Sequence, residues 1–203
     1  MVQLMSIKVK RGVVTACGPG GSWRSLTALV RFLVALALVG IPLSARVSAR
    51  ESGEYQVKAA FLYNFAKFVD WPGDAFSEGS APLVIGVIGI DPFGGELEKA
   101  IKGKNVGGRP LAVRRLKWGQ DLRSCHILFI SSSERRHLRQ ITESLRGASV
   151  LTVGDMEQFN QQGGIINFVL EASKVGFEIN SRGAAQARLR ISSKLLALAK
   201  NRQ

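Results

Sequence analysis

The polar residues best suited to binding in this sequence gather in two segments, near residues 64–71 and 178–188. They comprise one carboxylate, two amides, three cations and an indole, which are groups that hold other molecules by hydrogen bonds and charge. We predict that they line a small-ligand or partner site: Asn64, Lys67, Trp71, Glu178, Asn180, Arg182 and Arg188.

Structural roles account for the same residues equally well. Asn64 lies within the apolar stripe of a predicted helix, where a buried amide without a partner costs about 1–3 kcal/mol. A bond to a neighbouring loop would satisfy it, and Trp71 would plug the end of that helix. In the second segment the alternatives are an internal salt bridge and a helix cap, drawn from Glu178, Asn180, Ser181, Arg182 and Arg188.

No catalytic or metal-binding motif is complete. Gly89 and Gly94 have the spacing of a phosphate-binding loop, but glycine and glutamate follow in place of Lys and Ser/Thr. His126 and His137 have no further ligand at the spacing of a zinc site. We therefore predict no catalytic residues, no metal and no cofactor.

Two further arrangements resemble catalytic groups and are disfavoured. The serines at 131–133 follow a predicted strand, where a hydrolase nucleophile would lie, but no G-x-S-x-G surrounds them. Capping of the next helix, with Glu134 in its first turn, is the favoured role. Cys125 and His126 are neighbours in a strand, so their side chains point to opposite faces and cannot form a dyad.

The elements that would position these groups alternate between helix and strand. The sequence predicts an amphipathic helix over Tyr55–Pro72, with its buried stripe at Val57, Phe61, Phe65 and Phe68. Apolar runs bounded by turn residues predict four strands and a closing hairpin, at residues 83–90, 110–116, 125–131, 149–153, 165–170 and 174–179. Shorter helices are expected at 96–101, 132–145 and 155–162, and a final helix at 182–200.

This alternation indicates a single α/β domain. Strands separated by helices form βαβ units, which favour a mostly parallel sheet, while the hairpin adds an antiparallel strand. The expected fold is a mixed sheet of about five to six strands with flanking helices.

The first 49 residues have the layout of a secretory signal peptide. Five basic residues precede an apolar run over Phe32–Ile41, and small residues follow it, with Ala49 as the predicted cleavage position. The run is shorter than the roughly 20 residues that span a bilayer. We therefore predict a leader at 1–49 and an exported, periplasmic domain at 50–203.

Export changes the charge and the cysteine count. The whole chain has a net charge of +13, and loss of six basic residues with the leader leaves +7. This charge is spread along the chain rather than gathered with aromatic residues, so nucleic acid is not expected as a partner. Cys125 becomes the sole thiol, which excludes an internal disulfide and favours a buried, inert side chain.

Two motifs in the predicted mature chain resemble the YfiR family (DUF4154). The first is Lys58-Ala-Ala-Phe-Leu-Tyr-Asn-Phe-Ala-Lys-Phe68 with Trp71-Pro72, and the second is Val175-Gly-Phe-Glu-Ile-Asn180 followed by a pattern ending at Leu198-Ala199. The resemblance covers residues 55–199. It implies a periplasmic repressor that binds the sensor domain of an inner-membrane diguanylate cyclase, lowering cyclic di-GMP and biofilm formation.

Several expectations follow from this resemblance or stand against it. Proteins of this family carry disulfide-forming cysteines, so a single thiol departs from that pattern. A homodimer is expected from the aromatic surface of the first helix. The main alternative function is that of a periplasmic small-molecule binding protein without a cyclase partner. A hydrolase that uses the serines at 131–133 is the least favoured of the three hypotheses.

Overall fold

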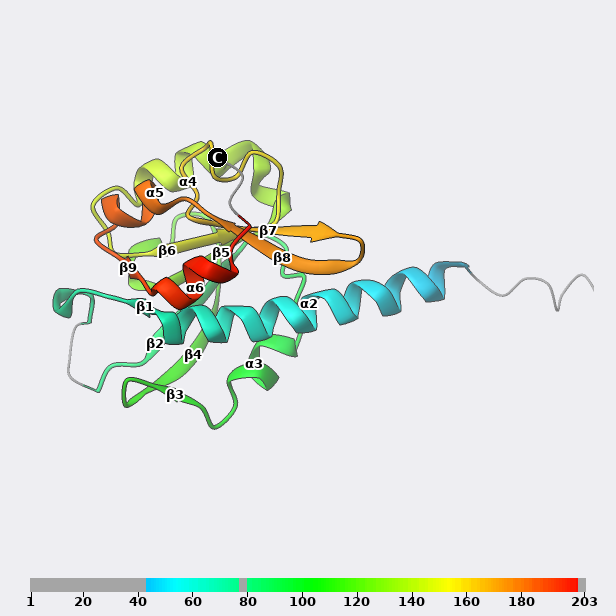
Figure 1. The fold of residues 1–203 in the computed structure, drawn as a ribbon, viewed down its shortest axis with the longest axis horizontal. Helices are drawn as coiled ribbons and strands as arrows, with labels where there is room; N and C mark the ends of the chain where they lie inside the picture. Colours follow the sequence, from blue (N-terminus) through cyan, green and yellow to red (C-terminus); the bar gives the residue numbers. More distant parts are fainter. Residues whose placement is uncertain (1–42, 77–79, 201–203) are drawn as a thin grey trace, which may run out of the picture. The chain divides into compact units, whose positions relative to one another are not determined.

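Five parallel strands form the centre of the fold, in a computed structural model that describes residues 43–76 and 80–200, with side chains from residue 53 onward. They are β2 (Leu83–Ile88), β4 (Arg109–Leu116), β5 (Ile127–Ile130), β6 (Leu151–Gly154) and β7 (Ile166–Glu171). Antiparallel strands β3 (Asn105–Val106) and β8 (Lys174–Ile179) complete the order β3-β4-β2-β5-β6-β7-β8 (Figure 1). The prediction of a mixed, mostly parallel α/β sheet is confirmed, with seven strands.

The central strands β2, β5 and β6 are buried because helices cover both faces. On one face α2 (Leu43–Phe68), α3 (Glu96–Ile101) and α6 (Ser193–Leu198) enclose a core that includes Phe65, Phe129 and Phe177. On the other face α4 (Leu138–Ser144) encloses a second core around Leu128 and Phe159. Sheets covered on both faces need continuous apolar strands, and β2 and β5 are buried at every position.

The first helix is buried on a different face from the one predicted. Ala59, Leu62, Phe65 and Ala66 face the sheet, whereas Val57 is 44% exposed. Phe61 and Phe68 are only partly buried, at the margins of the contact. The predicted buried face is therefore wrong by part of a turn around the helix. The aromatic residues at the margin repeat at nearly the same spacing as the buried residues, so both sets fit a helical pattern.

The predicted final helix is interrupted. It consists of α5 (Ser181–Gln186), the short strand β9 (Arg190–Ile191) and α6. Arg188 ends the first helical segment with a left-handed backbone, φ 57°, and β9 pairs with β1 (Val69–Asp70), which follows α2. A pairing partner 120 residues away is invisible to local propensity, which is why the sequence suggested one helix.

Two other segments differ locally. The predicted helix at 132–145 begins as a 3-10 segment, η3 (Ser132–His137), before α4. The predicted helix at 155–162 is a series of turns, although Met156 and Phe159 are buried as expected. Within the described part of the chain, residues 45–76 and 80–200 belong to one compact unit. Most of the predicted leader, residues 1–42, lies outside the described residues, and residues 43–49 belong to α2.

Candidate functional site

The strand order reverses between β2 and β5. In chain order the five parallel strands lie as 2-1-3-4-5, and sheets of this type bind ligands beyond the carboxyl ends of the strands at the reversal. Here that place is filled by the chain. The Ile90 N–H donates to Ser133 Oγ at 2.9 Å, and a Cβ at Gly89 would collide with that hydroxyl and with the Glu134 side chain. The absence of a side chain at residue 89, with φ 92°, allows this closure.

An arginine holds the turn that follows β2. Arg115 donates to Asp91 at 2.9 Å, to the Gly94 carbonyl at 2.6 Å and to Glu98. The hydrogen bond from Arg115 lowers the pKa of Glu98, so that the carboxylate stays ionised. The cation therefore fixes the loop between β2 and α3.

A buried ion pair connects α2 to the carboxyl end of β6. Lys58 Nζ lies 2.7 Å from Asp155 Oδ2, and the two side chains are 5% and 7% exposed. Tyr55 donates its hydroxyl proton to the same oxygen at 2.8 Å, and Glu54 lies 2.6 Å from the lysine. Tyr55 also packs edge-on against Phe93. A buried lysine with these partners fixes the position of the helix and is not free to act as a base.

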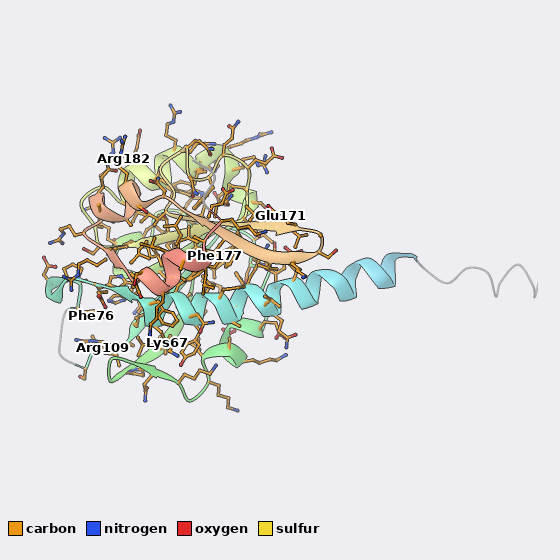
Figure 2. All side chains as sticks on the ribbon, viewed as in Figure 1. Lys67, Phe76, Arg109, Glu171, Phe177 and Arg182 are labelled. Atoms are coloured by element: carbon orange, nitrogen blue, oxygen red, sulfur yellow. The ribbon has the colours of Figure 1, made fainter. Side chains whose placement is uncertain are left out.

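A second polar cluster lies at the amino end of β5. His126 Nδ1 accepts the Val84 N–H at 3.1 Å, so Nε2 carries the proton and faces the Ala75 carbonyl at 3.1 Å. Burial lowers the pKa of His126 and keeps the ring neutral. Phe76 stacks on the ring at 4.3 Å, and Arg109 covers Phe76 at 3.9 Å (Figure 2). The histidine is thus a structural residue that joins β2, β5 and the segment after α2.

No hydrogen bond among the described residues joins the side chain of Ser131, Ser133 or Cys125 to a carboxylate or a histidine. Ser131 caps η3 by accepting the Ser133 N–H, as expected, and the two hydroxyls lie 3.3 Å apart. Cys125 is buried among apolar side chains, and burial raises the pKa of its thiol to about 11. A thiol that stays protonated is a poor nucleophile, so this cysteine behaves as the small buried hydrophobe that was predicted.

The three predicted binding residues of the first segment separate. Asn64 and Lys67 lie on the outer side of α2, where Asn64 borders a shallow hollow beside Val57 and Phe61. Lys67 Nζ lies 5.6 Å from the centre of the Tyr63 ring. Trp71 instead donates its indole N–H to the His126 carbonyl at 3.3 Å, so this side chain has a structural partner.

The four predicted residues of the second segment divide in the same way. Asn180 caps α5 by accepting the Gly183 N–H at 2.9 Å, and its amide group donates to two carbonyls of the 160–164 loop. Arg188 pairs with Asp74 at 2.8 Å rather than with Glu178. Glu178 and Arg182 make no ion pair with any described residue, which leaves their charges available.

These seven side chains do not form one site by direct contact. None of the hydrogen bonds and ion pairs among residues 53–76 and 80–200 joins two of them. Figure 2 shows Arg182 and Lys67 well apart, with Phe177 between them in that view. A surface that uses both segments would have to be broad, as a protein interface is, rather than a small pocket.

Sequence reasoning missed four side chains that the structure makes prominent: Lys58, Asp155, Ile90 and Trp118. A signal existed for Lys58, which precedes Leu62 and Phe65 by four and seven residues and so shares their buried face. Asp155 directly follows a buried strand, a usual place for functional or anchoring groups. Ile90 and Trp118 carried no signal, because exposure of an apolar residue is decided by tertiary packing.

The fold and these clusters define a class: a small, doubly covered α/β domain whose usual ligand crevice is closed by its own loops. No described helix is long and apolar enough to cross a membrane, and the described residues contain no cluster of three or more metal-binding side chains. The chain belongs to the YfiR/HmsC-like family (DUF4154), which it matches over residues 55–200. This is a family of periplasmic, regulatory and non-catalytic proteins. No curated protein matches the chain.

Proposed function

We propose that this protein is a periplasmic repressor of an inner-membrane diguanylate cyclase, acting by binding the periplasmic sensor domain of that enzyme. The observation that carries the proposal is the family match, which spans nearly all of the predicted mature chain. A signal peptide over residues 1–49 would deliver the domain to that compartment. Release of the repressor would raise cyclic di-GMP and favour biofilm formation.

The mechanism we propose is a population shift of the cyclase. A repressor acts in this way when it binds the inactive arrangement of its partner more tightly than the active one. Each tenfold change in the ratio of the two arrangements requires about 1.4 kcal/mol of differential binding. The domain suits this role, because the loops at the carboxyl ends of β2 and β5 are already held by hydrogen bonds. Little conformational entropy would therefore be lost on binding.

Glu178 and Arg182 are the predicted partner residues of the second segment whose charges are not used inside the domain. Both have no ion pair among the described residues, and Arg182 is exposed. A partner group would therefore not have to displace an internal contact. Asn64 and Lys67 also remain candidates on the outer side of α2, whereas Trp71, Asn180 and Arg188 contribute mainly to the scaffold.

Co-purification from bacterial membranes tests the proposal. The tagged full chain should fractionate with the periplasm and recover an inner-membrane protein with a diguanylate cyclase domain. Deletion of the gene for the repressor should raise cyclic di-GMP. Glu178→Ala and Arg182→Ala should reduce recovery, while Lys99→Ala, an exposed site in α3, should not. Recovery of the unprocessed chain in the cytosol, or unchanged cyclic di-GMP after deletion, would rule out this role. Sedimentation of the purified chain measures the predicted homodimer.

A second candidate is small-molecule binding without a cyclase, and one cavity favours it. A hollow of about 450 Å³ lies between the end of α4 and α5, and Thr142, Arg146 and Gln186 contribute polar groups to its lining. This volume is sufficient for a small ligand. Its position differs from the expected site beside α2. Native mass spectrometry of chain purified from the periplasm, with Arg146→Ala as the comparison, tests it through retention of a bound small molecule.

A further inference from the structure

Two large apolar side chains are exposed beyond the carboxyl ends of β2 and β4, beside the place where the strand order reverses. Ile90 is 75% exposed and Trp118 is 46% exposed. The two residues are held by consecutive residues of one segment. The Ile90 N–H is bonded to Ser133, and the Trp118 indole is bonded to Glu134. Isolated exposed apolar residues are ordinary, but two that border one rigid contact form a potential anchoring point.

The tryptophan is held in one orientation. Its indole N–H donates to Glu134 Oε2 at 2.9 Å, and His137 Nδ1 lies 3.1 Å from the same oxygen. The two rings meet edge-on with centres 5.0 Å apart. One carboxylate therefore orients both rings before any partner arrives. Such ordering lowers the entropy lost on binding, and tryptophan is the side chain most enriched among residues that dominate binding energy.

The free charge around this point is positive. Lys117 adjoins the tryptophan, and Arg135, Arg136 and Arg139 lie in η3 and α4; all four are exposed. None of them forms an ion pair within residues 53–76 and 80–200. The nearby carboxylates are occupied, because Glu134 holds the two rings, Asp91 binds Arg115, and Asp121 caps the turn before β5. The surface thus presents cations without matching anions.

We propose that Ile90, Trp118 and His137, with the four surrounding cations, form the docking platform for an acidic segment of the cyclase's periplasmic domain. The segment would place an apolar side chain over Trp118 and Ile90 and carboxylates beside the cations. This inference rests on the proposed function and adds a contact surface to the one that Glu178 and Arg182 offer. A protein is favoured over an anionic membrane because the Glu134 carboxylate is bonded to the Trp118 indole, and inserting it among lipids together with the tryptophan would be costly.

Calorimetric titration of the full chain with the periplasmic domain of the co-purified cyclase tests the platform. Trp118→Ala and Ile90→Ser should each weaken binding by about tenfold or more. Leu198→Ser, at a site on α6 that is 67% exposed, should leave affinity unchanged. The pair Arg135→Gln and Arg136→Gln should weaken binding mainly at low salt, while Lys102→Gln with Lys194→Gln, which changes the net charge equally, should not.

The outcomes separate the two proposals. If the unsubstituted chain binds and neither Trp118→Ala nor Ile90→Ser weakens binding, the platform is wrong and the repressor role stands. If the unsubstituted chain binds no cyclase, the repressor role fails and the platform fails with it. Binding to vesicles of phosphatidylglycerol tests the membrane alternative. If Trp118→Ala abolishes binding to the vesicles but leaves the affinity for the cyclase unchanged, the surface binds a membrane and the inference is overturned.

Discussion

Lys58 Nζ and Asp155 Oδ2 lie 2.7 Å apart in the interior, joining residues that are 97 positions apart in the chain. Removing one member of a buried ion pair leaves the other charge without its partner and typically costs about 3–5 kcal/mol. Because Glu54 also contacts the lysine, we expect Asp155→Ala and Lys58→Met to lower the unfolding free energy by about 3 kcal/mol each, measured by urea denaturation.

A matched surface pair provides the control for this prediction. Lys99 lies 2.6 Å from Glu96, but the lysine is 73% exposed. Exposed pairs contribute about 0–1 kcal/mol, so Lys99→Met should change the unfolding free energy by less than about 1 kcal/mol. Equal losses of unfolding free energy for Lys58→Met and Lys99→Met would show that the buried pair of Lys58 and Asp155 contributes no more to stability than an exposed pair.

The same pair shows where reading the sequence reaches its limit. The strands β2 and β5 and the helix α3 were predictable, because continuous apolar runs and turn residues are local signals. The partner of Lys58 and the pairing of Val69 with Ile191 are not local, since they depend on which distant segments the folded sheet brings together. This limit matters most for the candidate site: the sequence predicts Trp71 and Asn180 as binding residues, but it does not show the hydrogen bonds that their side chains make within the domain.

The neutral state of His126 predicts a dependence of stability on pH. The unfolded chain takes up a proton on this residue near pH 6.5, whereas burial lowers the pKa in the folded chain. The unfolded state therefore binds more protons between these two values, and the unfolding free energy is fully retained above about pH 6.5 and falls as the pH decreases. A single proton gives a slope of at most about 1.4 kcal/mol per pH unit.

Two histidine variants isolate this contribution. His126→Gln should remove the additional slope below pH 6.5 in urea denaturation curves recorded from pH 5 to pH 8. His137→Gln should retain it, because His137 is exposed on η3. Parallel pH profiles for the unsubstituted chain and His126→Gln would argue against the buried neutral ring.

Gly86 and Cys125 are expected to be coupled. A Cβ at residue 86 would lie 2.5 Å from the Cys125 sulfur and 3.1 Å from a Leu128 methyl group. Gly86→Ala should therefore lower the unfolding free energy by about 1–3 kcal/mol through overpacking. Cys125→Ala opens space at the same point, so the double variant should lose at least about 0.5 kcal/mol less than the sum of the single variants. Additive losses in denaturation experiments would mean that the neighbouring chain moves to accept the methyl group.

Asn180 and Glu178 should respond differently although they share one predicted site. Asn180→Ala removes the α5 cap and two further hydrogen bonds, so we expect a loss of about 2 kcal/mol in unfolding free energy. Glu178→Ala removes no ion pair within the described residues and should cost less than about 0.5 kcal/mol. Thermal denaturation of both variants checks this. A comparable loss for Glu178→Ala would make it unsuitable as a probe of partner binding.

Arg188 ends α5 in a conformation that favours glycine. Its φ of 57° costs a non-glycine residue about 1–2 kcal/mol, while its ion pair with Asp74 is exposed and contributes little. Arg188→Gly should therefore be more stable than Arg188→Ala by about 1 kcal/mol in urea denaturation. Arg190 lies in β9, where glycine is unfavourable, so the order should reverse for Arg190→Gly and Arg190→Ala. If alanine is preferred at residue 188 as well, the chain continues as the single helix that the sequence suggested, and the pairing of β9 with β1 would have to be abandoned.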